Sequence, residues 1–241
     1  MRFSNVGSRA LLFGSAMLVI TVPCVVGFSA SASSPTPAVE LASALHDATS
    51  SKWVHEVITA KEGGLVASRV DDIGSTEGRQ VIALSSGATA EVVAFANAKK
   101  AYIRANILGI AKYFAFPTKT PGKYANKWLE LTSSDANYAA VVSATTLSSD
   151  FPQLLQISGP LSVGHVTSLA GVPVIEVLGK IPASSNNPAL AVTLYLSSSG
   201  KLLPLELRET AKGLSAVIKW SKWGHKVNLS SPTGAEMEPA V

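Results

Sequence analysis

The stretch from Leu190 to Gly224 decides the fold, and it reads LAVTLYLSSSGKLLPLELRETAKGLSAVIKWSKWG. Three apolar runs, residues 190–196, 202–208 and 214–224, are separated by short turns that contain glycine. Within each run, every second side chain is large and apolar over most of its length. Since successive side chains of a strand point to opposite faces, the pattern predicts an antiparallel meander with one apolar and one polar face. The short turns are typical of hairpins.

Length and composition favour one packed domain. The chain has 241 residues, of which 47% are hydrophobic and only 15% are charged, so a sizeable core is available and global disorder is excluded. The formal net charge is +4, and the basic residues are scattered as pairs and singles. Because nucleic-acid binding needs a dense basic stripe, we exclude nucleic acid as a partner.

The first 32 residues are predicted to be an export signal. Two arginines precede a long apolar run, and Ala30-Ser31-Ala32 offers a small-residue cleavage site. Two alternatives stay open: the run is long enough to serve as an uncleaved membrane anchor, or Cys24 is a lipidated cysteine. Pro23 argues against lipidation, because the usual lipobox has a small residue there. In each case the domain acts outside the cytoplasm, in the cell envelope or as a secreted protein.

The rest of the chain alternates strand-like runs with a few helical ones. Residues 33–37 form a linker, residues 38–232 one domain, and residues 233–241 a polar tail. Strands are predicted at residues 53–60, 65–73, 79–85, 89–95, 100–104, 128–131, 161–167, 172–180 and 226–230, besides the three of the meander, and helices at 38–49, 105–113, 135–145 and 149–157. This order predicts an α+β domain, a long curved antiparallel sheet with a few helices packed on its concave face.

Several local phrases suggest a family. They are Ala101-Tyr-Ile-Arg104, Lys127-Trp-Leu129, Leu194-Tyr-Leu196 with Leu203-Pro-Leu205, and Trp220-Ser-Lys-Trp-Gly224. In these phrases, and in the order of leader, helix, meander, helical insertion and second meander, the chain resembles the LolA-like lipoprotein carriers, in particular the actinobacterial LppX/LprG-type envelope lipoproteins. The resemblance covers residues 38–232. It implies a half-barrel whose sheet and helices enclose the acyl chains of a lipid or lipoprotein.

The resemblance therefore implies a lipid-binding or lipid-transport protein that is not an enzyme, has a lipid as partner and a membrane surface nearby, and uses no cofactor. Candidate cavity-lining residues are Ile82, Leu84, Tyr102, Leu108, Phe114, Phe116, Leu147, Leu154, Val192, Leu194, Ile218 and Trp220. The same residues could fill a solid core, which would make the protein a ligand-free structural or protein-interaction domain of the envelope. A cryptic hydrolase is the third alternative.

Motifs for other chemistry are absent from the sequence. The four histidines are far apart, and no metal-binding, nucleophile-elbow or nucleotide-binding string occurs, so no catalytic or metal site is predicted. Asp71-Asp72 is interpreted as a solvated strand end. We hypothesise that residues 118–126 gate a cavity and that Trp223, which lies beside Lys222 and Lys226, touches a membrane surface.

Overall fold

The structure is a computed structural model that describes residues 36–112, 120–135, 138–147, 151, 157–164, 167–183 and 188–237. The predicted export signal and Cys24 lie outside these ranges, as does most of the helix predicted at residues 149–157. Among the described residues, no helix has both the length and the apolarity that a membrane crossing demands.

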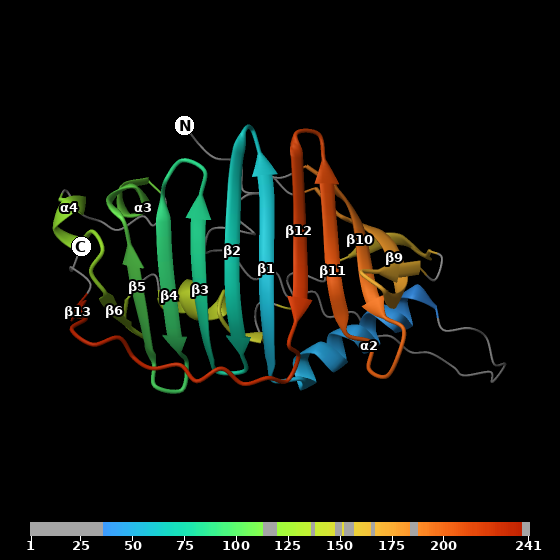
Figure 1. Cartoon of the computed structure of the whole chain (residues 1–241), viewed down its shortest axis with the longest axis horizontal. Coiled ribbons are helices and arrows are strands. Elements are labelled where there is room, and N and C mark those ends of the chain that lie inside the picture. Colours follow the sequence, from blue (N-terminus) through green and yellow to red (C-terminus); the bar gives the residue numbers. More distant parts are fainter. Residues whose placement is uncertain are drawn as a thin grey trace.

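The chain forms one large, unclosed, curved sheet of 13 strands (Figure 1). The strands are β1 (Trp53–Glu62), β2 (Leu65–Gly74), β3 (Glu77–Leu84), β4 (Thr89–Phe95), β5 (Lys100–Ala105), β6 (Leu129–Thr132), β7 (Ser158–Val163), β8 (Thr167–Leu169), β9 (Val172–Ile181), β10 (Leu190–Ser197), β11 (Pro204–Ala211), β12 (Leu214–Ser221) and β13 (Glu236–Met237). Their order is β13-β6-β5-β4-β3-β2-β1-β12-β11-β10-β9-β7, with β8 paired to β9. Every pair is antiparallel except β13 with β6.

Pairing between β1 and β12 joins the first meander to the last. The register runs from His55 opposite Ser221 to Glu62 opposite Leu214. Strands β1 to β6 therefore form one half of the sheet, and β12 to β7 form the other (Figure 1). The two halves therefore belong to one continuous sheet.

Four helices are described, α2 (Pro37–Ser50), α3 (Ile107–Lys112), α4 (Pro121–Tyr124) and α5 (Tyr138–Ser143). Helix α2 begins with a proline in its first turn, where the missing N–H has no intrahelical partner to lose. Its Ala44 and Ala48 are fully buried against the β12–β9 half. Helix α5 packs Val141 against the β3–β6 half. The side chains that α2 and α5 contact lie on the same face of the sheet by register. We call this face of the sheet the concave face.

The segment that follows α5 lies directly against Gly78 of β3. A Cβ at this position would overlap the carbonyl oxygen of Thr145. Thr146 forms an isolated bridge with Gly74 of β2. Only a residue without a side chain permits this backbone to lie directly on the sheet.

The predicted architecture is confirmed, but two of the predicted strands differ. In place of the one strand predicted at residues 161–167, β7 ends at Val163 and β8 begins at Thr167. Residues 226–230 carry no strand, and the last strand is instead β13, inside the stretch predicted as a polar tail. Strand β12 already has β1 and β11 on its two sides, so residues 226–230 find no free edge beside it. The chain runs on past the ends of the strands to the free edge of β6 (Figure 1).

Candidate functional site

The concave face is the candidate site, because it collects most of the predicted lining residues. Ile82, Leu84, Leu147, Val192, Leu194, Ile218 and Trp220 are all buried on it. They fall into two apolar clusters. Ile82 and Leu84 belong to a cluster on β3–β6, and the other five belong to a cluster centred on β1 and β12–β9.

Some predicted lining residues lie elsewhere. Tyr102 is buried, but it pairs with Val93 and Glu130 on the outer face and makes an edge-to-face contact with Phe95. Tyr102 was predicted as a cavity-lining residue, and the structure places it out of phase with the inward residues of β5, Ala101 and Ile103. Leu108 lies on α3 with about a third of its surface exposed (36%). Phe114, Phe116, Leu154 and Cys24 lie outside the described residues.

A buried polar patch interrupts the apolar face. It consists of Glu56, Arg69, Asp71 and Gln80, each no more than 4% exposed. Glu56 faces Asp71 across β1 and β2, and Asp71 faces Gln80 across β2 and β3. The register therefore places three of the four side chains in one row across the middle of the sheet, between the two apolar clusters.

Ion pairs and hydrogen bonds hold the polar patch together. Arg69 Nη2 lies 2.6 Å from Glu56 Oε1, and Arg69 Nε lies 2.6 Å from Asp71 Oδ2. The indole nitrogen of Trp220 donates to Glu56 Oε2 at 2.6 Å. Buried charges persist only when they are paired in this way. The amide nitrogen of Gln80, in contrast, is buried without a hydrogen-bond partner in the described part of the chain.

The sequence interpretation missed this patch. Asp71 was taken for half of a solvated pair, whereas it is 1% exposed. Only Asp72 faces outward, where its Oδ1 lies 2.8 Å from His55 Nδ1. The signal was present in the strand period, since Arg69 and Asp71 are in phase with the buried Ala67 and Ile73.

The outer face carries a double arginine–carboxylate bridge. Glu91 of β4 accepts hydrogen bonds from Arg79 at 2.8 Å and from Arg104 at 2.5 Å. Arg104 also stacks over the ring of Trp128, 4.7 Å from its centroid. Partial burial alone would raise the pKa of Glu91, but the hydrogen bonds and charges of Arg104 and Arg79 outweigh it, so this pKa lies below its ordinary value.

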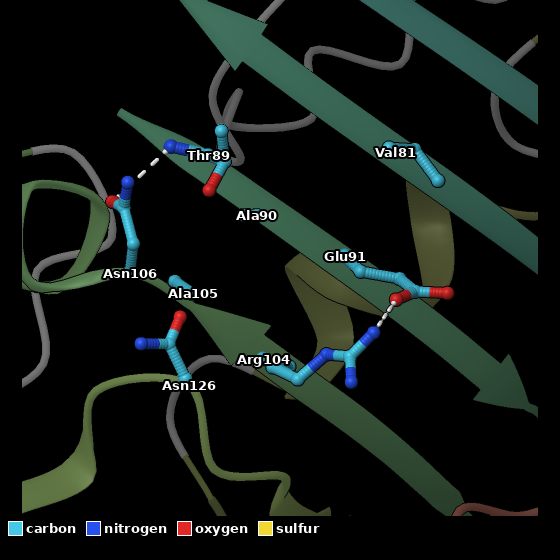
Figure 2. Close-up of a pocket in the computed structure, with 8 residues that line it drawn as sticks. All are labelled: Val81, Thr89, Ala90, Glu91, Arg104, Ala105, Asn106 and Asn126. Atoms are coloured by element: carbon cyan, nitrogen blue, oxygen red, sulfur yellow. Dashed lines mark hydrogen bonds and ion pairs between the residues drawn. The ribbon is translucent and has the colours of Figure 1, made fainter. Parts of the chain in front are cut away.

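Two hollows flank this bridge. One, of about 280 Å³, lies beside Arg104 and is bordered by Asn106 and Asn126 (Figure 2). Asn106 caps the N-terminus of α3, because its Oδ1 accepts a hydrogen bond from the backbone N–H of Gly109. This bond fixes the side chain at the edge of the hollow. The other hollow, of about 500 Å³, lies between β3–β4, Trp128 and residues 227–233.

A row of Ser221, His55 and Asp72 crosses the outer face and bears on the hydrolase alternative. His55 faces Ser221 on one side and Asp72 on the other. Neither of the two hollows is lined by these three residues. The row therefore lies apart from these two hollows. Among the described residues, no group of three His, Cys, Asp or Glu side chains could hold a metal ion.

Trp223 lies at the edge of the larger apolar cluster. Its ring packs against Phe151 at a centroid distance of 5.3 Å, and its Nε1 donates to the carbonyl oxygen of Pro204 at 3.1 Å. The ring is half-buried, so part of it faces solvent. Membrane contact at this corner stays a prediction.

Comparison with solved structures supports the same fold. The crystal structure of the lipoprotein LppX from Mycobacterium tuberculosis aligns with a TM-score of 0.52 and 16% identity, over 80% of this chain and 98% of LppX. The chain has an LppX-like fold. LprF from Mycobacterium bovis aligns with a TM-score of 0.48 and 14% identity, over 83% of this chain and all of LprF. No protein-family model matches the sequence, and no curated protein does.

Proposed function

We propose that this protein is an exported envelope protein that binds the acyl chains of a lipid between its concave face and its helices, without catalysing a reaction. The observation that carries the proposal is the LppX-like sheet, whose concave face holds two apolar clusters. The described helices on that face are few compared with the width of the sheet, since α2 has 14 residues and α5 has 6. Acyl chains would add apolar contact there, and each buried methylene contributes about 0.8 kcal/mol.

Entry to the concave face would pass the segment 118–126, which we propose as the gate. Its described part contains α4, and the backbone N–H of Asn126 donates to the carbonyl oxygen of Ala105 at 2.7 Å. That bond ties the end of the segment to the end of β5. A disulfide or crosslink that locks the segment should slow lipid exchange, and unchanged exchange would contradict the gate.

Native mass spectrometry of the chain as exported by an actinobacterial host tests the lipid proposal. We expect a diacyl lipid to copurify at near-stoichiometric level and solvent extraction to release it. A clean protein mass that stays unchanged after incubation with lipid vesicles would contradict the proposal. It would favour a ligand-free interaction domain, the candidate supported by the burial of both apolar clusters among the protein's own side chains.

A further inference from the structure

The side-chain amide of Gln80 lies in the middle of an apolar face, and its N–H donor makes no hydrogen bond within the described part of the chain. Gln80 is 2% exposed, and its Nε2 has no hydrogen-bond partner in the described part of the chain. Buried donors are nearly always satisfied, because leaving one unpaired costs its full desolvation free energy. Such a donor on a proposed ligand-binding face points to an acceptor that a ligand would supply.

The surroundings of Gln80 define what kind of acceptor fits. Its cross-strand neighbour Asp71 and the next residue of the row, Glu56, share the guanidinium of Arg69 at 2.6 Å each. A free fatty acid would bring a third carboxylate to this row and would be repelled by the first two. A neutral carbonyl oxygen accepts a hydrogen bond without adding charge. An ester or amide carbonyl is therefore the matching group.

The two apolar clusters lie on opposite sides of the polar patch along the width of the sheet. Beyond Gln80 the row continues with Val92 of β4 and Ile103 of β5. On the other side, Trp220 leads to Ile218, Leu207 and Leu194. A molecule with a carbonyl-bearing centre and an apolar arm on each side would match this arrangement. Diacyl lipids have that chemistry, whereas a single-chain fatty acid has one arm and a charged end.

We infer that the polar patch is the docking site for the ester linkage of a two-chain lipid. Gln80 Nε2 donates a hydrogen bond to an ester carbonyl oxygen, and the two acyl chains lie along the two clusters, one on the β3–β6 half and one on the β12–β9 half. The inference rests on the proposed lipid-binding function and adds to it the class of ligand and the residue that recognises the linkage.

A comparison of ester and ether lipids tests the inference. The full chain as exported is incubated with vesicles that contain equal mole fractions of dipalmitoylphosphatidylcholine and its dihexadecyl ether analogue, which has the same head group and chain length but no carbonyl. Native mass spectrometry then gives the ratio of the two bound lipids. The same measurement is made on Gln80→Met, which keeps the length of the side chain but loses the donor. The matched control is Val81→Met, which places the same residue at the next position of β3, on the outer face of the sheet.

We expect the unaltered protein and Val81→Met to prefer the diester roughly tenfold, the factor that one net hydrogen bond supplies. Gln80→Met should bind both lipids about equally. Bound lipid with no ester preference in the unaltered protein, or an undiminished preference in Gln80→Met, would overturn the inference and leave the lipid-binding proposal standing. Absence of both lipids would overturn both. If Gln80→Met does not fold, as judged by circular dichroism, the ester preference of the unaltered protein decides alone.

Discussion

Trp220 donates a hydrogen bond of 2.6 Å from its indole nitrogen to Glu56 Oε2, across the strand pair that joins the two halves of the sheet. Both side chains are buried, with 3% and 0% of their surfaces exposed. The other carboxylate oxygen of Glu56 accepts from Arg69 at 2.6 Å. The junction between the two meanders is thus fastened near one end of the β1–β12 pairing by charge-assisted hydrogen bonds, which are stronger than neutral ones.

Replacing Trp220 by phenylalanine should show how much the junction depends on this bond. The change keeps an aromatic ring but removes the donor, so it leaves a buried carboxylate oxygen unsatisfied and should lower the free energy of unfolding by about 2–3 kcal/mol. Urea unfolding followed by circular dichroism measures the loss. The matched control is Trp223→Phe, which breaks a half-buried bond to the Pro204 carbonyl and should cost about 1 kcal/mol. Equal losses in the two variants would contradict the role assigned to Trp220.

Removal of Arg69, the cation of the polar patch, should lower the free energy of unfolding more than Trp220→Phe does. Arg69→Met leaves Glu56 and Asp71 buried without their shared guanidinium, and we expect a loss of about 3–5 kcal/mol in the free energy of unfolding. Lys127→Met, the control, breaks a pair in which both side chains are nearly half exposed and should cost less than about 1 kcal/mol. Chemical denaturation of both variants gives the comparison. An Arg69→Met variant as stable as Lys127→Met would mean that the patch contributes little.

Local patterns were enough to predict most elements of the fold. Period-two alternation located the strands, and β4 has the bounds that were predicted from it. Helical spacing of apolar residues located α2 within one residue at each end. These features depend on neighbours a few residues apart, which a sequence displays directly.

The junction and the polar patch depend on contacts that no local pattern reveals. Glu56 and Trp220 are 164 positions apart, and only the strand register brings them together. The strand period shows that Glu56, Arg69 and Asp71 point inward, but it does not show which of them meet. Tyr102 was misplaced for a related reason, because an aromatic side chain can be buried on the outer face by a neighbour such as Phe95.

Glu91 should make stability depend on pH in the acidic range. Its pKa is lowered in the folded protein by Arg104 and Arg79, relative to an ordinary value of 4.5. The folded state therefore binds the proton less readily than the unfolded chain. The stabilisation is fully present above pH 4.5 and is lost as the pH falls through the lower, folded-state pKa.

The Glu91→Gln variant isolates this contribution. We expect it to be less stable than the unaltered protein by about 1 kcal/mol at pH 7, a modest value because both arginines are half-exposed. The difference should be smaller at pH 3 than at pH 7, because the unfolded chain binds the proton below pH 4.5. Thermal unfolding at the two pH values measures it, and Glu236→Gln, which loses an exposed pair with Lys127, should show almost no difference at either. A Glu91→Gln deficit that is the same at both pH values would rule out titration of this carboxyl as the cause.

Gly78 tests whether the segment after α5 must lie directly on the sheet. An alanine Cβ there would overlap the Thr145 carbonyl oxygen, and because the obstructing atom belongs to the backbone, the segment has to move as a unit. We expect Gly78→Ala to lower the free energy of unfolding by about 2 kcal/mol or more, as overpacking does. Gly122→Ala is the control, since its Cβ would meet only Ile107 at an ordinary 3.7 Å and would lie in the helix α4, where alanine is favoured over glycine. Equal stability of the two variants would mean that the contact of the segment with β3 yields easily, and a lipid could then displace it without cost.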